Sequence, residues 1–281
     1  MPLRFLILAS ETPDQREARR KEVGAASDET YAETLRAIDA GISCDHLSCV
    51  DGTPPPPTQA LQAYDGIVLS GSPIQMHADT PETRSAAAFM THVFEAGVPA
   101  FGSCAGLQIA CVAAGGRCKP RSPRMEAGFV RGIVATDAGR NHPLLAGRPL
   151  VWDAPAMHSD EVAVLPDGAT ILAGTRTTPV QAVEIRRGAG LFWGVQYHPE
   201  LSLAEIAAAL RRQADDLLDQ KLVADEAALE AHAARIDALD SAPDRRDLAW
   251  QLGLDREVTE PERRMREIGN FIAFAHARRA T

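Results

Sequence analysis

The segment Val98-Pro-Ala-Phe-Gly-Ser-Cys-Ala-Gly-Leu-Gln108 decides the fold, because it combines a short apolar strand, a tight turn and the start of a helix. The turn has the pattern G-x-C-x-G, in which glycines on either side of Cys104 let the strand and the helix approach closely. A helix N-terminus favours a thiolate over a thiol and presents backbone N–H groups to an oxyanion. The pattern therefore indicates a nucleophilic cysteine, and a buried structural cysteine in a glycine turn is the alternative interpretation.

Strands and helices alternate on both sides of this segment. The alternation predicts an α/β protein with a mostly parallel central sheet that helices cover on both faces. Ligands bind such sheets beyond the carboxyl ends of the strands, which directs attention to Ser70–Pro73 and Gly102–Gly106. The expected strands are Leu3–Ala9, Asp45–Val50, Ile67–Leu69 and Val98–Phe101, and the expected helices are Tyr31–Ala40, Arg84–Glu95 and Leu107–Ala114.

Other parts of the chain depart from this alternation. Glu11–Thr30 is strongly polar and is predicted to form a loop followed by the start of a helix. Phe129–Tyr197 has the pattern of short strands and turns, with a hairpin around Arg186–Gly190. After Pro199 the chain is predicted to be helical to its end. We therefore divide it into a catalytic domain at residues 1–210 and a helical C-terminal extension at residues 211–281, which packs on the core and offers a surface for a dimer or a partner.

A second segment, Gly194-Val-Gln-Tyr-His-Pro-Glu200, supplies the groups that a thiol nucleophile needs. A histidine can take the thiol proton and return it to the leaving amine, and a carboxylate can orient the imidazole. Pro199 fixes φ, so His198 and Glu200 are held in a restricted relation at the end of an apolar strand. A histidine and a glutamate at a surface strand end are the alternative interpretation, which the cysteine turn disfavours.

The composition excludes several classes of function. The 281-residue chain has a formal net charge of −9 and no Lys/Arg-rich run, so neither a nucleic acid nor a membrane is an expected partner. Its five cysteines are an odd number without paired C-x-x-C spacings, so neither a disulfide framework nor a metal site is expected. The apolar run Phe5–Ala9 is too short for a signal-peptide core, and a cytoplasmic protein is expected.

In combination, four segments resemble the class I, triad-type glutamine amidotransferases. Gly102–Gln108 and Gln196–Glu200 are similar to the signature pair of that family. Tyr64–Pro73 resembles the loop that supplies the other half of the oxyanion hole. Met157–Val162 resembles the S-H-x-D-x-V segment of GMP-synthetase-type members. The resemblance covers about Leu3 to Leu210 and implies a flavodoxin-like sheet in a stand-alone, GMP-synthetase-like glutaminase domain.

The resemblance also implies roles for individual residues. Cys104 would attack the side-chain amide carbon of glutamine, His198 would act as general base and acid, and Glu200 would orient His198. Backbone N–H groups of Ser72 and Ala105 would hold the oxyanion, although many members have glycine in place of Ser72 and a bulkier residue in place of Ala105. The implied substrate-binding residues are Gly71, Gln108, Met157, His158, Ser159 and Asp160.

Alternatives remain open on the same residues. The chain contains neither a Ser-Gly-Gly-x-Asp-Ser loop nor a Walker-type phosphate loop, so no cofactor is expected and any ammonia acceptor would be a separate synthase chain. The family also contains hydrolases of γ-glutamyl amines and peptides, which use the same triad without an acceptor. A non-catalytic binding protein on the same fold is a further alternative, against which the intact Cys104, His198 and Glu200 argue.

Overall fold

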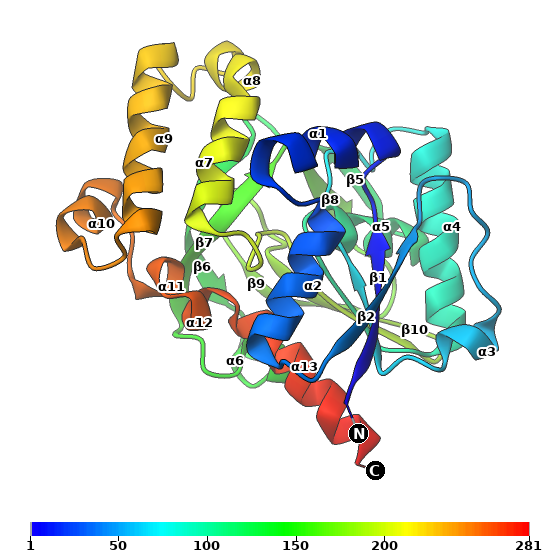
Figure 1. Ribbon diagram of the computed structural model, residues 1–281. Coiled ribbons are helices and arrows are strands. Elements are labelled where there is room, and N and C mark those ends of the chain that lie inside the picture. Colours follow the sequence, from blue (N-terminus) through cyan, green and yellow to red (C-terminus); the bar gives the residue numbers. More distant parts are fainter. Residues whose placement is uncertain (1, 281) are drawn as a thin grey trace.

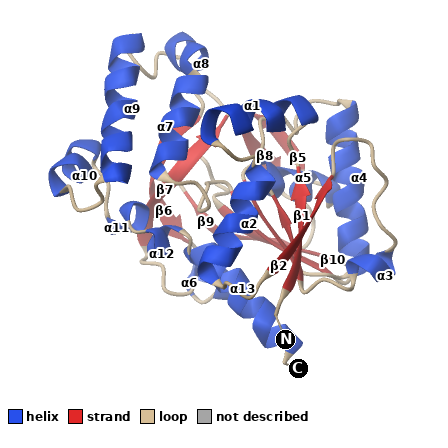
Figure 2. Ribbon diagram, in the orientation of Figure 1, coloured by secondary structure: helices blue, strands red, loops and turns tan. Residues whose placement is uncertain are grey.

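The computed structural model describes residues 2–280, and within them a sheet of nine strands forms the centre of the molecule (Figure 1, Figure 2). The strand order is β2-β1-β3-β4-β11-β10-β9-β6-β7, and β5 pairs with β8 in a separate ribbon. The strands are β1 Arg4–Ala9, β2 Ser43–Ser48, β3 Gly66–Leu69, β4 Ala100–Ser103, β5 Arg117–Pro120, β6 Glu126–Ala135, β7 Val151–His158, β8 Asp160–Val164, β9 Ala169–Gly174, β10 Ala182–Arg187 and β11 Gly190–Val195.

The parallel half of the sheet consists of β2, β1, β3, β4 and β11. Every residue of β3, β4 and β11 is buried, as expected for short apolar strands that helices cover on both faces. β11 pairs with β4 although the two are far apart in the sequence, and the register sets Val195 opposite Ser103. The two segments that follow these strands, which begin at Cys104 and Gln196, therefore leave the sheet at the same edge.

The antiparallel half of the sheet comes from the second half of the chain. The predicted hairpin is confirmed, since β10 and β11 pair antiparallel from Ala182 opposite Val195 to Arg187 opposite Gly190. β9, β6 and β7 continue the sheet outward from β10. The α/β fold with a parallel central sheet is confirmed, and the short strands extend that sheet rather than forming a separate one.

Helices cover both faces of the sheet (Figure 2). One apolar cluster packs α2 and α13 against one face, and a second packs α4 and α5 against the other. The helices are α1 Pro13–Val23, α2 Ser27–Ile38, α3 Thr58–Leu61, α4 Pro81–Ala96, α5 Ala105–Ala113, α6 Asp137–Arg140, α7 Leu203–Arg212, α8 Ala214–Asp219, α9 Glu226–Ser241, α10 Arg246–Leu252, α11 Arg256–Thr259, α12 Pro261–Arg264 and α13 Arg266–Arg279, with a short 3₁₀ turn at Pro143–Leu145.

The prediction of a loop at the start of Glu11–Thr30 is wrong, because α1 is a complete helix. Thr12 and Gln15 form a capping box at its start, and Gly24 ends it in the left-handed conformation at φ 87°. Arg19 is the one residue of this helix that is buried. The helix therefore has no apolar stripe that the sequence pattern could reveal, and its caps define its ends.

The last helix brings the C-terminal extension onto the sheet. Phe271 of α13 stacks on Phe101 of β4 with ring centroids 5.6 Å apart, and it meets Phe5 and Trp193 edge-on at 6.0 and 6.1 Å. Helix α13 therefore packs on the sheet, whereas α9 packs on α7 (Figure 1). Among residues 2–280, no helix is long and apolar enough to cross a membrane.

Candidate active site

Cys104 occupies the turn between β4 and α5 and adopts φ 49° and ψ −108°, which non-glycine residues rarely do. The glycines on either side permit the turn. A Cβ on Gly106 would lie 2.7 Å from the carbonyl oxygen of Leu69, and one on Gly102 would lie 3.1 Å from Gly106. Cys104 is 5% exposed, and its Sγ lies 3.6 Å from the carbonyl oxygen of Met157. Strained backbone of this kind concentrates at functional sites.

His198 and Glu200 lie beside this turn. The backbone N–H of Cys104 donates to the carbonyl oxygen of Val195 at 2.8 Å, which joins the ends of β4 and β11. Nδ1 of His198 bonds to Oε1 of Glu200 at 2.7 Å, so the other ring nitrogen, Nε2, is left for the thiol. Burial lowers the pKa of His198, but the charges of Glu200 and Cys104 outweigh it and raise this pKa well above 6.5. The site therefore favours the protonated form of the His198 imidazole.

Two residues that the sequence analysis missed hold the carboxylate of Glu200. Oγ of Ser103 donates to Oε1 at 2.9 Å, and the hydroxyl of Tyr31 donates to Oε2 at 3.2 Å. The Tyr31 hydroxyl also lies 2.5 Å from Oγ of Ser103, and both side chains are fully buried. Burial and the charge of Glu200 raise the pKa of Tyr31 well above its ordinary value, so the hydroxyl stays a donor. These two hydrogen bonds fix the position of the Glu200 carboxyl group, which accepts from the imidazole.

Gly71 and Ser72 form the loop that follows β3. A Cβ on Gly71 would lie 2.8 Å from Cε1 of His198, so only glycine leaves room for the imidazole. The hydroxyl of Ser72 accepts a hydrogen bond of 3.4 Å from the backbone N–H of Ile74. Ala105 is the first residue of α5, and its N–H has no acceptor within that helix. The loop and the helix start flank the thiol, and their role as oxyanion donors stays a prediction.

Within Met157–Asp160, the side chains of His158 and Asp160 form hydrogen bonds to other residues of the protein. His158 bonds through Nδ1 to the carbonyl oxygen of Asp160 at 2.8 Å and through Nε2 to Glu126 at 2.9 Å. Burial raises the pKa of the Glu126 carboxyl group. The hydrogen bond to His158 and the charge of His158 together outweigh this effect, so the pKa lies below its ordinary value. The carboxylate of Asp160 accepts bonds from the backbone N–H and Nδ1 of His77 at 3.1 and 2.8 Å. These contacts join the segment to the loop after β3, and direct substrate contact stays a prediction.

Gln108 and Ser159 differ in their surroundings. Gln108 is buried in α5, where its Nε2 donates to the carbonyl oxygen of Asp160 at 3.0 Å and to Oε1 of Gln196 at 3.2 Å. Ser159 is exposed, and its Oγ accepts a bond of 3.5 Å from Nε2 of Gln75. The side-chain amide of Gln108 therefore supports the Asp160 segment as well as lining the site.

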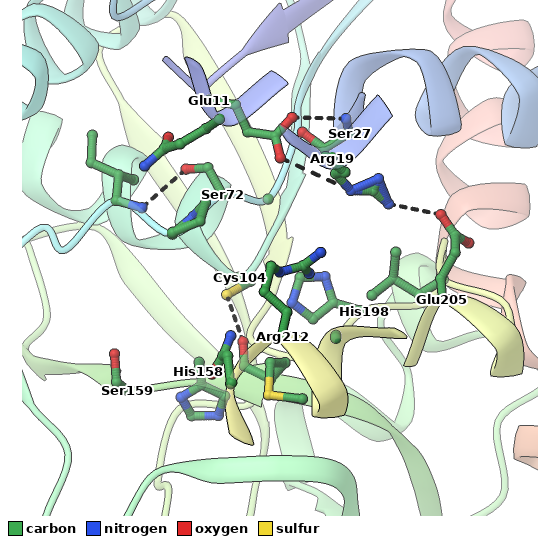
Figure 3. A pocket seen from close by; sticks show the side chains of 18 of the residues that line it. Glu11, Arg19, Ser27, Ser72, Cys104, His158, Ser159, His198, Glu205 and Arg212 are labelled. Carbon is green, nitrogen blue, oxygen red and sulfur yellow. Dashed lines mark hydrogen bonds and ion pairs between the residues drawn. The ribbon is translucent and has the colours of Figure 1, made fainter. Parts of the chain in front are cut away.

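A cavity of about 350 Å³ opens over Cys104 and brings the predicted segments together (Figure 3). Ala105 is not part of the lining of this cavity. The predicted residues in the lining are Gly71, Ser72, Cys104, Gln108, Met157, His158, Ser159, Asp160, His198 and Glu200. The lining also includes residues that the sequence analysis missed, among them Glu11 before α1, Arg19 on α1, and Glu205 and Arg212 on α7. Of these four, only Glu205 had a sequence signal, because Ser202-x-x-Glu205 is a capping-box pattern.

In this α/β protein, a cysteine, a histidine and a glutamate lie together beyond the ends of neighbouring parallel strands. This arrangement places the protein in the class of cysteine-dependent hydrolases. Within residues 2–280, no group of three or more His, Cys, Asp or Glu side chains is arranged to hold a metal ion. The family model for class-I glutamine amidotransferases matches residues 38–215. The chain belongs to this family.

Comparisons with individual proteins are consistent with this family. The chain is 37% identical over 220 residues to a gamma-glutamyl-L-1-hydroxyisopropylamide hydrolase from a Pseudomonas species, covering 77% of this chain and 74% of that enzyme. It is 26% identical over 181 residues to a GMP synthase from Neisseria gonorrhoeae, and it spans only 33% of that enzyme. A glutamine amidotransferase structure from Thermotoga maritima superposes with a TM-score of 0.62 at 16% identity, covering 96% of this chain and 99% of that one. The last likeness supports the fold alone.

Proposed function

We propose that this chain hydrolyses the side-chain amide of L-glutamine, with Cys104 as nucleophile, His198 as general acid and base, and Glu200 as the residue that orients His198. The observation that carries the proposal is the buried series of contacts from Glu200 through His198 to the thiol, with 2.7 Å between Oε1 and Nδ1. An imidazolium beside a cysteine stabilises the thiolate, which is the reactive form of the side chain.

The first half of the reaction forms a thioester. The sulfur of Cys104 attacks the side-chain amide carbon, and negative charge moves onto the amide oxygen. Backbone N–H groups of Ser72 and Ala105 hold that oxygen, in a site that excludes most water. Nε2–H of His198 then protonates the amide nitrogen as the carbon–nitrogen bond breaks. Ammonia leaves, and the γ-glutamyl group remains on the sulfur.

The second half of the reaction consumes one water molecule. Nε2 of His198, now neutral, takes a proton from water as its oxygen attacks the thioester carbon. The tetrahedral intermediate again places its oxyanion between Ser72 and Ala105. The carbon–sulfur bond breaks, glutamate leaves, and the sulfur of Cys104 returns to the thiolate beside a protonated imidazole. Glu200 stabilises that imidazolium in both halves without changing its own charge.

Glutamate release from L-glutamine tests this proposal with two matched variants. Cys104→Ala is expected to abolish turnover while the protein stays folded. Cys111→Ala is the control, because Cys111 is fully buried in α5, the helix that follows Cys104, and its Sγ bonds to the carbonyl oxygen of Val164 at 3.6 Å. Equal loss of turnover in the two variants, or persistent turnover in Cys104→Ala, would contradict the assignment of the nucleophile.

A second candidate function is the hydrolysis of γ-glutamyl amides that carry a larger amine. The observation that favours it is the cavity, which continues from Cys104 to α1 and α7 and so is longer than the departure of ammonia requires. The Pseudomonas relative is named for cleaving such an amide. The thioester chemistry is the same, and a higher kcat/KM for substituted amides than for glutamine would favour this candidate.

We also propose an ammonia acceptor, a location and an oligomeric state for the enzyme. If glutamine is the substrate, a separate synthase chain is the proposed acceptor of the ammonia, and the cytoplasm is the proposed location. Residues 211–281 are proposed as a helical extension of the catalytic domain and as the surface that a second copy or that synthase chain would contact. Light scattering of the purified protein tests the homodimer, because a monomer mass would exclude it.

A further inference from the structure

The loop between β3 and α4 forms one side of the cavity beside Cys104. Its residues 71–75 line the cavity and include Ser72, one of the two proposed oxyanion donors. A Cβ on Gly71 would lie 3.8 Å from Cβ of Cys104, so the loop comes close to the nucleophile. Residues 71–77 belong to no helix or strand, so no ladder of backbone hydrogen bonds fixes them. An oxyanion donor must already be in place when the charge develops, so this loop needs other anchors.

Asp160 is the main polar anchor of residues 71–77. Its Oδ2 accepts a hydrogen bond of 3.1 Å from the backbone N–H of His77, and both of its carboxylate oxygens lie 2.8 Å from Nδ1 of that histidine. The Asp160 side chain is 4% exposed, and poor hydration strengthens such bonds. Within residues 2–280, the one other hydrogen bond from this stretch to a segment outside the loop joins Gln75 to Ser159 at 3.5 Å. That distance is long for a hydrogen bond, so the pair with His77 is the stronger connection.

Asp160 is also bonded to the helix that carries the second proposed oxyanion donor. Its main-chain carbonyl oxygen accepts a hydrogen bond of 3.0 Å from Nε2 of Gln108. The backbone N–H of Gln108 donates to the carbonyl oxygen of Cys104 at 3.1 Å and so closes the first turn of α5, which begins at Ala105. One residue therefore connects the loop of Ser72, through its side chain, with the helix of Ala105, through its main chain.

We propose that Asp160 is a positioning residue for the amide hydrolysis. Through His77 and Gln108 it fixes the loop of the first oxyanion donor relative to the helix of the second. The inference rests on the proposed function, in which backbone N–H groups of Ser72 and Ala105 hold the oxyanion. That oxyanion is present in the tetrahedral intermediates but not in the bound amide. Loosening the loop therefore slows the reaction of the bound substrate more than it weakens substrate binding.

The first measurement is kcat and KM for whichever of L-glutamine and γ-glutamyl ethylamide is hydrolysed faster. Asp160→Ala removes both bonds to His77, and kcat is expected to fall about 10²-fold, near the cost of one oxyanion donor, while KM changes less than about threefold. His77→Ala removes the imidazole bond but keeps the backbone bond to Asp160, so kcat is expected to fall about tenfold. Asp160→Asn keeps one acceptor oxygen for His77 and is expected to recover part of the activity that Asp160→Ala loses.

His276→Ala is the matched control for His77→Ala. Nε2 of His276 lies 2.9 Å from Asp39, so this variant also breaks a histidine–aspartate pair, but neither residue lines the cavity. Its kcat is expected to equal that of the wild type. The fold is expected to persist in the His77 and Asp160 variants, because Met76 is buried in an apolar cluster and keeps the end of the loop attached.

Alkylation of Cys104 by iodoacetamide separates a misplaced oxyanion donor from a disturbed nucleophile. The reaction forms a thioether and releases iodide, so it requires the thiolate but forms no oxyanion, and mass spectrometry of the peptide that contains Cys104 gives its rate. In His77→Ala and Asp160→Ala this rate is expected to stay within about twofold of the wild type, because the base beside the thiol is unchanged. A rate that fell as far as kcat would mean that the two residues support the whole site, which would overturn the positioning role.

The kinetic outcomes separate this inference from the proposed function. An unchanged kcat in Asp160→Ala would overturn the inference and leave the Cys104 chemistry intact. A large rise in KM at unchanged kcat in both Asp160 variants, without a change in His77→Ala, would show instead that Asp160 binds the substrate directly. Absence of Cys104-dependent turnover of both amides in the wild type is a different result, because it would remove the proposed function together with the inference that rests on it.

Discussion

Glu267 in α13 accepts a hydrogen bond of 2.8 Å from the hydroxyl of Tyr197, the residue directly before His198. Arg148 bonds to the same glutamate at 2.7 Å and to Glu257 at 2.7 Å, and its side chain is only 2% exposed. Burial and the charge of Glu267 raise the pKa of Tyr197 well above its ordinary value, so the tyrosine stays a donor. The C-terminal helices are thereby bonded to the strand end that carries the proposed general base.

Glu267→Ala is expected to destabilise the protein by about 3 kcal/mol, because it leaves the buried Arg148 short of a partner. Glu267 is fully buried, so water cannot replace it without rearrangement. Urea unfolding measures the change. Glu262→Ala is the control, because Glu262 is exposed on the neighbouring helix and its loss is expected to change stability by less than about 0.5 kcal/mol. Equal midpoints for the two variants would contradict a structural role for the buried pair.

A chain that ends at Asp219 is expected to lose solubility or activity. It lacks Phe271, whose ring contacts Phe5, Phe101 and Trp193 on one face of the sheet. Exposing that apolar surface favours aggregation. Size-exclusion chromatography and glutamate release measure both properties. A truncated protein that is monodisperse and equally active would show that the extension is dispensable for the fold and for the site.

The triad could be predicted because each of its parts is local in the sequence. The G-x-C-x-G turn and the His-Pro-Glu segment each place chemical groups next to a strand end, and the parallel sheet brings the two ends together. The two hydrogen bonds that hold the carboxylate of Glu200 could not be predicted in the same way. Tyr31 and Ser103 reach the carboxylate from positions 169 and 97 residues away, and neither has a local pattern that indicates a partner.

The side of the cavity that α1 and α7 line could not be predicted from the sequence, for a different reason. Helix α1 has polar residues on all sides and buries only Arg19, so hydrophobic periodicity gives no signal for it. The ion pair between Arg19 and Glu205 joins residues 186 positions apart. Pairing of this kind follows from the packing of α1 on α7, which only the three-dimensional structure reveals. The sequence therefore indicates the reacting centre of the site but not the side of the cavity that α1 and α7 form.

Gly71→Ala is expected to lower kcat/KM by about 10²-fold, since the new methyl group would lie 2.8 Å from Cε1 of His198 and displace the imidazole. The fold is expected to persist, because the clash is with one side chain. Gly269→Ala is the matched control, because a Cβ at that position in α13 meets no atom within 4 Å. Kinetics on glutamine and far-UV circular dichroism give both readouts. Unimpaired turnover in Gly71→Ala would show that the imidazole is not confined as the geometry requires.

The pKa of His198 is expected to fall in the Cys104→Ala variant. Burial opposes the charged imidazole, and the charges of Glu200 and Cys104 overcome that opposition. Removing the sulfur removes one of those two contributions, so the ring should titrate at lower pH. NMR of the ring nitrogens measures the shift. His232 is the internal control, since burial and the charge of Arg235 lower its pKa and it is not part of the active site.

The raised pKa of His198 also makes the free energy of unfolding depend on pH. The pKa of His198 is raised above its ordinary 6.5 in the folded protein, so the folded state binds the proton more tightly than the unfolded chain does. Its contribution to stability is fully present below about pH 6.5 and is lost as the pH rises through the folded value. In Cys104→Ala that loss should be complete at a lower pH, which urea unfolding from about pH 6 to about pH 10 would detect. If His198 titrated at the same pH in both proteins, no thiolate would lie against the imidazole, and the proposed nucleophile–base pair would be wrong.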